Sequence, residues 1–182
     1  MRRYRTLPDP FVAELQRIPG YDDLMTGYTQ CASCQRCERS LVYLTPSEQR
    51  GAERAGLRVY GEGAAARINR VGCKCPFYRP SDAACTAYLD RPLICHLFPL
   101  DLLEGEDGHP WWALFGACDE VRKGKLVGRV GAFRRLAREI DRRMPLALKQ
   151  ALLADAKDAV PEPLFYRYPV HWLVPVSGVG LE

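Results

Sequence analysis

The hydrophobic and polar positions of the chain predict several short helices and one extended segment. Over Val130–Met144, apolar residues recur three and four positions apart and most of the arginines lie off that face, as in an amphipathic helix. Pro145 breaks this helix and begins another with a similar apolar side, which Pro161 ends. We therefore predict a helical hairpin over residues 126–160.

Two further helices are predicted nearer the N-terminus. Pro10–Ile18 has apolar residues at helical spacing and predicts a short amphipathic helix that packs as a lid. Thr45, followed by Pro46 and Glu48, is typical of a capping box with proline at the first helical position. A second helix should therefore begin here and run to about Leu57.

Extended structure is predicted in two places. Between Ala64 and Val71 the apolar residues are few, but the flanking glycines favour a strand with turns around it. Past Pro163, aromatic or β-branched residues occupy even-numbered positions, while prolines interrupt the odd ones. This pattern predicts an edge strand or an extended strap over residues 161–180. Its members are Tyr166, Tyr168, Val170, Trp172, Val174 and Val176.

The composition places these elements in one small domain. The chain has 182 residues, of which 47% are hydrophobic and 26% are charged, which is the balance of an ordinary globular protein. We expect a single domain over residues 1–182. Prolines precede any apolar run that could form a signal peptide, and no segment approaches the roughly 20 apolar residues of a membrane span. We therefore expect a cytoplasmic protein without membrane contact.

The charge pattern does not point to a polyanionic partner. The net charge is only +4, which neither requires nor excludes one. The arginine-bearing side of Val130–Met144 also carries Glu139 and Asp141, so we interpret it as a solvated helix face and do not expect nucleic acid binding. The acidic segment 101–107 is interpreted as a solvated turn.

Eight cysteines carry the strongest chemical signal. In a reducing cytoplasm disulfides are the exception, so cysteines in close groups indicate metal or redox chemistry. Cys31, Cys34 and Cys37 have C-x2-C-x2-C spacing in a polar segment. A loop of this spacing can turn three sulfurs toward one point, as in ferredoxin-type loops, with the fourth ligand coming from a distant position. Zinc sites more often pair one C-x2-C with a remote second pair, so the triplet favours a 4Fe-4S iron–sulfur cluster over zinc.

The other five cysteines follow in the next part of the chain. Cys73 and Cys75 are two positions apart, so in extended backbone both would face one side, and either or both could be ligands. Cys85, Cys95 and Cys118 complete the eight candidate metal ligands. Eight thiolates could fill two four-coordinate sites, or four could hold one site while four stay free. We expect the cysteine-cluster metal-binding region to span residues 28–120.

The cysteine pattern resembles the YkgJ-type cysteine-cluster family, described as a zinc- or iron-chelating domain. The resemblance covers about Cys31 to Cys118 and is carried by the triplet, by the helix that begins at Thr45, and by the run Cys85-x2-Tyr88-x2-Arg91-Pro92-x2-Cys95-x3-Pro99. We expect a small, irregular α+β domain centred on a metal, with its cysteine-bearing loops covered by helices.

Two positions depart from the family pattern. The double Cys that closes the family's first motif is Cys37-Glu38 here, and the basic residue after the later Cys is His96. Cys73 or Cys75 could supply the missing thiolate, since the oxygen of Glu38 is a poorer match for soft thiolate chemistry. His96 could be a nitrogen ligand, but adjacent residues seldom both reach one metal, so we expect it beside the ligands.

Two residues between the later cysteines have predicted supporting roles. A site of four thiolates is negatively charged, and its burial requires nearby donors or cations. Arg91 is placed for that role, and a surface salt bridge is the alternative. Tyr88 is interpreted as a half-buried wall rather than a catalytic acid.

The sequence therefore predicts a cysteine-ligated metal-binding protein. An enzyme is one alternative, because proteins that methylate lysines of flagellin contain a similar cysteine pattern, and the resemblance allows a redox or methyl-transfer role. No S-adenosylmethionine-binding segment is recognised outside the cysteine region, however. The other alternative is a module in which zinc shapes a surface for a protein partner.

Overall fold

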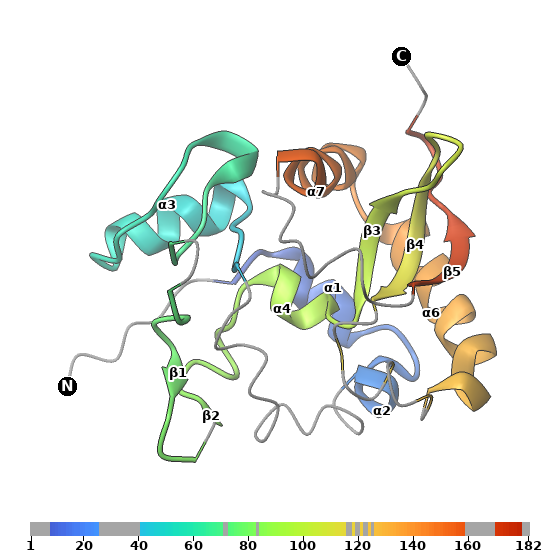
Figure 1. The fold of residues 1–182 in the computed structure, drawn as a ribbon, viewed down its shortest axis with the longest axis horizontal. Helices are drawn as coiled ribbons and strands as arrows, with labels where there is room; N and C mark the ends of the chain where they lie inside the picture. Colours follow the sequence, from blue (N-terminus) through green and yellow to red (C-terminus); the bar gives the residue numbers. More distant parts are fainter. Residues whose placement is uncertain are drawn as a thin grey trace.

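Helices and two small antiparallel sheets make up the part of the chain that the structure describes (Figure 1). The computed structural model describes residues 8–25, 41–70, 73–82, 84–115, 118, 121, 124, 126–158 and 170–179. This mixture of elements confirms the predicted α+β class. In chain order the elements are α1 (Phe11–Gln16), α2 (Tyr21–Met25), α3 (Pro46–Arg54), the 3-10 helix η2 (Gly63–Ala65), β1 (Tyr78–Arg79), β2 (Ala84–Cys85), α4 (Leu93–Leu97), β3 (Leu100–Glu104), β4 (Pro110–Phe115), the 3-10 helix η3 (Val127–Arg129), α6 (Val130–Arg143), α7 (Leu146–Asp158) and β5 (Val170–Pro175).

The larger sheet has the strand order β3-β4-β5, and both pairs are antiparallel. β5 pairs with β4 alone among the described strands, which confirms the predicted edge strand over Val170–Pro175. Residues 161–169 of the predicted strap lie outside the described residues. The interpretation of segment 101–107 as a solvated turn is wrong for its first four residues, because they belong to β3. Within this strand Leu100 and Leu102 are buried and alternate with more exposed positions.

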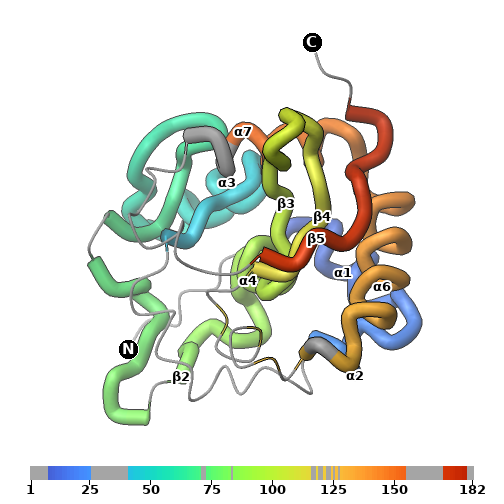
Figure 2. Tube along the Cα trace, turned by 45° about the vertical axis from the view of Figure 1, so that its right-hand side comes forward, coloured from blue at the N-terminus to red at the C-terminus, as the bar shows by residue number. Residues whose placement is uncertain are grey.

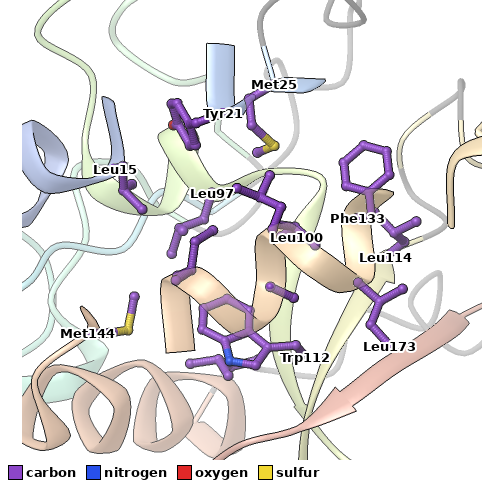
Figure 3. Close-up of a cluster of buried hydrophobic side chains, with 14 of the residues drawn as sticks. Leu15, Tyr21, Met25, Leu97, Leu100, Trp112, Leu114, Phe133, Met144 and Leu173 are labelled. Atoms are coloured by element: carbon purple, nitrogen blue, oxygen red, sulfur yellow. The ribbon is translucent and has the colours of Figure 1, made fainter. Parts of the chain in front are cut away.

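The main hydrophobic core lies between this sheet, α6 and the N-terminal helices. Trp112 and Leu114 of β4 and Phe133 and Ile140 of α6 are fully buried, at 0% exposure. Figure 3 shows Trp112, Leu114 and Phe133 in one cluster with Tyr21 and other apolar side chains. The buried positions of α6 are those of the predicted apolar face, so the structure confirms this helix.

One residue assigned to the solvated face of α6 is buried instead. Asp141 is 6% exposed and accepts hydrogen bonds from Trp112 Nε1 at 3.0 Å and from the backbone N–H and hydroxyl of Ser177. Lys149 Nζ of α7 lies 2.9 Å from the same carboxylate. Asp141 therefore joins β4, α6, α7 and the segment after β5 through polar contacts that an amphipathic pattern does not reveal.

Helices α6 and α7 have different main packing partners. α6 packs chiefly on β5, whereas α7 packs chiefly on β3 and on η2. Met144 and Pro145 connect the two helices. This arrangement places α7 over the junction between the large sheet and the left-hand part of the molecule in Figure 1.

The two N-terminal helix predictions are confirmed with shorter bounds, but the strand predicted over 64–71 is wrong. α3 begins with the full capping box: Thr45 Oγ1 accepts from the backbone N–H of Glu48, and Glu48 accepts from the N–H of Thr45. In place of the strand, η2 is followed by isolated bridges of Arg67 with Tyr43 and Tyr60. The chain turns at Gly61, whose φ of +75° and close approach to Ala65 O leave no room for a Cβ.

A second, smaller apolar cluster lies apart from the main core. Its buried members are Val42, Leu44, Ala52, Ile68, Cys75, Phe77 and Ala87. These residues come from α3, the segment before it, the loop after η2 and the segments that flank the β1–β2 hairpin. Figures 1 and 2 both place α4 between this hairpin and the α1–α2 pair. None of the described helices is long and apolar enough to cross a membrane.

Candidate metal centre

The structure describes five of the eight candidate ligands. Cys31, Cys34 and Cys37 of the triplet lie outside the described residues, as does Glu38. Among the described residues, no three His, Cys, Asp or Glu side chains come close enough together to hold a metal ion. No disulfide joins any two of the five described cysteines. Their surroundings divide them into three groups.

Cys75, Cys85 and Cys95 share the second apolar cluster. Cys75 is one of its buried members at 8% exposure, and Cys85 and Cys95 are partly buried and pack against it. The β1–β2 hairpin brings Cys85 opposite Tyr78, whose backbone N–H donates to the carbonyl oxygen of Cys75 at 3.0 Å. Three cysteines, one from a loop, one from β2 and one from α4, therefore gather around one patch of apolar side chains.

Burial controls the protonation of Cys75. Desolvation raises the pKa of its thiol to about 11; the backbone N–H groups of Phe77 and Tyr78 lower it, and the nearby Cys85 raises it. The thiol is therefore neutral at physiological pH in the absence of a metal. A soft metal ion would bind the thiolate and displace this proton.

Cys73 and Cys118 have different surroundings. Cys73 is exposed and lies on the rim of a polar hollow. Cys118 follows β4, is 7% exposed, and belongs to the main hydrophobic core. The structure thus separates Cys73 from Cys75, which spacing alone made equivalent, because the chain from 73 to 77 passes from solvent into the second cluster.

Helix α4, which carries Cys95, is positioned through Glu48 of α3. Glu48 Oε1 accepts from the backbone N–H of Leu93, the first residue of α4, at 2.6 Å, and from the N–H of Asp9 at 3.2 Å. A carboxylate at a helix N-terminus satisfies donors that have no partner within the helix. Burial raises the pKa of Glu48 to about 7, although these backbone N–H groups oppose the shift. The sequence revealed its capping role but not its reach to α4.

Tyr21 connects α2 to the same helix. Its hydroxyl donates to the backbone carbonyl oxygen of His96 at 2.8 Å. Burial raises the pKa of Tyr21 to about 12, although the positive charge of Arg91 opposes the shift. α2 ends at Met25, from which the chain continues into the segment 26–40 that holds the triplet. No sequence pattern indicated this contact.

Asn69 holds the other end of that segment near Cys73. Its Oδ1 accepts from the backbone N–H of Val42 at 3.0 Å, and its Nδ2 donates to the carbonyl oxygen of Cys73 at 3.1 Å. The described residues on either side of segment 26–40 therefore contact α4, through Tyr21, and the backbone of Cys73, through Asn69.

Arg91 is a buried cation in this region. It is 7% exposed, so it does not lie at the surface, where the alternative interpretation placed it. Its guanidinium carbon lies 4.1 Å from the centroid of the Tyr88 ring, which is half-buried as predicted. The charge of Arg91 also acts on Tyr21 and His96.

His96 is buried beside this cation. Its exposure is 5%, and Nε2 has no hydrogen-bond partner among the residues that the structure describes. Burial and then the charge of Arg91 lower its pKa to about 4, so the imidazole is neutral at physiological pH. A neutral imidazole nitrogen can bind a metal or hydrogen-bond to a ligand sulfur.

These residues fit a zinc or iron centre. Thiolate and imidazole are the donors that both metals prefer. A buried arginine supplies positive charge for a site of several thiolates, and the unpartnered Nε2 of His96 is a polar atom for which the described protein offers no contact.

Comparison with known proteins agrees with this assignment. No curated protein and no solved structure matches the chain. A family model matches residues 29–114, a range that includes the triplet, the second apolar cluster and α4. The model carries the description "Putative zinc- or iron-chelating domain" and is named for the spacing CxxCxxCC. Over residues 29–114 the chain is therefore similar to the CxxCxxCC family of zinc- or iron-chelating domains.

Proposed function

We propose that the protein binds an iron–sulfur cluster through thiolates of the triplet and of the second apolar cluster. The observation that carries the proposal is the gathering of Cys75, Cys85 and Cys95 around one apolar patch. The described residues that precede and follow the triplet segment are hydrogen-bonded near Cys95 and Cys73, by Tyr21 to His96 and by Asn69 to Val42 and Cys73. A reducing compartment such as the cytoplasm would keep the thiols available for the metal.

The proposed ligands are Cys31, Cys34 and Cys37 together with cysteines of the second cluster. Three ligands of a C-x2-C-x2-C loop leave one corner of a cubane for a remote thiolate. Cys75 is favoured over Cys73 because Cys75 belongs to the buried cluster and Cys73 is exposed. Cys118 remains a candidate for a second site, since eight thiolates are enough for two four-coordinate centres.

Arg91 and His96 would support the bound centre. The buried guanidinium would balance part of the negative charge of the thiolates, and the Nε2 of His96 would contact a ligand sulfur or the metal. When bound, an iron–sulfur cluster would supply one-electron redox chemistry, whereas zinc would act through the stability it gives to the fold. The spacing of the triplet favours the cluster.

The test is purification of the full chain without oxygen, followed by metal analysis and a visible spectrum. The proposal predicts a brown protein with iron and acid-labile sulfide in equal amounts. Cys34→Ser should lose the colour, and Ser33→Ala in the same loop is the matched control that should keep it.

Three results would separate the alternatives. A colourless protein with stoichiometric zinc would show the zinc-chelating form of the family and contradict the cluster. A folded protein without metal would contradict metal binding itself. A cluster whose spectrum changes on addition of S-adenosylmethionine would contradict a centre held entirely by protein ligands and favour the enzyme alternative.

A further inference from the structure

A polar hollow of about 330 Å³ lies beside Cys73. It is lined by residues of three chain segments. Most of them are basic or polar (Arg58, Tyr60, Asn69, Arg70, Cys73 and Lys74), and Ile68 and Pro76 complete the lining. The proposed metal centre needs none of these side chains, since Cys75 is favoured over Cys73. The hollow is therefore a separate feature of the surface.

Hydrogen bonds hold the walls of this hollow in place. Tyr60 and Arg67 exchange two backbone hydrogen bonds, of 2.9 and 2.8 Å. These bonds join the segment that carries Arg58 and Tyr60 to the segment that carries Asn69 and Arg70. The side-chain amide of Asn69 donates to the carbonyl oxygen of Cys73 at 3.1 Å, which joins the segment of Asn69 to the segment that carries Cys73 and Lys74. The hollow is thus formed by the fold itself before any ligand enters.

Two guanidinium groups lie against one aromatic ring in this hollow. The guanidinium carbons of Arg58 and Arg70 are each 5.1 Å from the centroid of the Tyr60 ring. A third cation, Lys74, lines the hollow next to Cys73, and its Nζ lies 5.8 Å from the centroid of the Tyr78 ring. Each contact with an aromatic face orients a cation without neutralising it.

The charges of the two arginines are not balanced by carboxylates. Within the described part of the chain, neither Arg58 nor Arg70 forms an ion pair, whereas two other exposed arginines do. Arg79 pairs with Asp82 at 2.5 Å and Arg142 with Glu139 at 2.8 Å. Like charges held together without a counter-charge favour the binding of an anion.

We propose that this hollow binds the phosphate group of a small phosphorylated molecule. A guanidinium presents paired N–H donors that match phosphate oxygens, and a phosphate brings up to two negative charges to three nearby cations. A single carboxylate would offer one charge and two oxygens to the same groups. The volume of about 330 Å³ is within the range of small-molecule sites.

The test is a calorimetric titration of the full, metal-loaded chain with inorganic phosphate at constant ionic strength. Saturable binding is expected, and the double variant Arg58→Gln/Arg70→Gln should weaken it by about tenfold or more, because it removes charge-assisted hydrogen bonds. Arg134→Gln on α6 is the matched control, since Arg134 is exposed and far from the hollow in sequence, and it should bind phosphate like the wild type. Metal content, measured on the same samples, should be equal in all of them.

Two outcomes would overturn the proposal. Phosphate binding that is absent, or unchanged in the double variant, shows that the hollow is not its site. A single-stranded RNA or an Asp/Glu-rich peptide that binds through Arg58 and Arg70 while phosphate does not shows that the cations serve a macromolecule instead. Because the metal is measured separately, either result leaves the proposed metal centre to its own test.

Discussion

The hydroxyl of Tyr21 donates a hydrogen bond of 2.8 Å to the carbonyl oxygen of His96, and both side chains are almost fully buried, at 1% and 5% exposure. Tyr21 begins α2, which leads into the triplet segment, while His96 follows Cys95 on α4. One hydrogen bond therefore joins α2 to α4, the helix that carries the proposed ligand Cys95.

Replacing Tyr21 with Phe should lower the free energy of unfolding by about 1 kcal/mol, because a buried carbonyl loses its donor while the ring packing stays. Chemical denaturation measures this change. Metal content at neutral pH should be unaffected, since Tyr21 is not a proposed ligand. Tyr78→Phe is the control, as the Tyr78 hydroxyl forms no hydrogen bond with the described part of the chain. Equal losses in the two variants would show that the contact with His96 has no special role.

Glu48 should make stability fall as pH rises through the weakly acidic range. Its pKa is raised by burial from 4.5 to about 7, so the folded state holds a proton that the unfolded state releases, and raising the pH between these values favours unfolding. Glu48→Gln removes this titration. The free energy of unfolding of the wild type minus that of Glu48→Gln should decrease from about pH 4.5 to about pH 7 and then stay constant. A difference that grows over that range would mean that the folded carboxylate is already ionised.

The Asp141–Lys149 pair should contribute strongly to folding. The two side chains are 8% and 5% exposed with N and O atoms 2.9 Å apart, so Lys149→Met leaves a buried carboxylate without its cation and should cost about 3–5 kcal/mol. Equilibrium denaturation measures the loss, and Arg142→Gln, at an exposed pair, is the control that should leave the midpoint unchanged. Recovery of stability in Asp141→Asn/Lys149→Met would confirm that the unpaired charge causes the loss.

Asp141 has a pH dependence opposite to that of Glu48. Burial alone would raise its pKa, but hydrogen bonds from Ser177, Lys149 and Trp112 outweigh burial and lower it. A lowered pKa means that its contribution is complete above the pKa of the unfolded chain and is lost as the pH falls through the folded pKa. Asp141→Asn should therefore flatten the acid side of the stability profile.

Cys75→Ser should reduce metal retention more than Cys73→Ser. Cys75 is buried in the cluster that Cys85 and Cys95 also contact, whereas Cys73 is exposed on the polar hollow. Metal per chain and the thermal unfolding midpoint of the two variants measure the contrast. Equal retention would mean that the neighbouring thiols substitute for each other, and greater loss in Cys73→Ser would reverse the assignment.

Local patterns in the sequence predicted the helices α1, α3, α6 and α7 and the strand β5, but not α2, α4 or the strands β1 to β4. The capping box at Thr45 and the apolar stripe of α6 follow from short-range rules, since a helix start and an amphipathic face depend on residues three or four apart. The error over 64–71 also has a local cause. Gly61 turns the chain with a positive φ, and Arg67 bridges two different segments by one residue each, so no strand forms.

The features that organise the candidate site depend on contacts far apart in the sequence. Glu48 reaches Leu93 across 45 positions and Tyr21 reaches His96 across 75. Neither contact leaves a periodic trace, because each is a single hydrogen bond formed only after the helices pack. Cysteine spacing indicated metal binding, but the distinction between Cys73 and Cys75 required the burial of each side chain.

The metal content of Cys34→Ser, measured per chain against the wild type and Ser33→Ala, tests the central claim most directly. Binding free energy at a cysteine-ligated centre becomes folding free energy, so losing one ligand of the triplet should remove both the metal and much of the thermal stability. The account predicts a metal-depleted Cys34→Ser protein with a lowered melting temperature beside a fully loaded control. Full metal occupancy and unchanged melting in Cys34→Ser would contradict it.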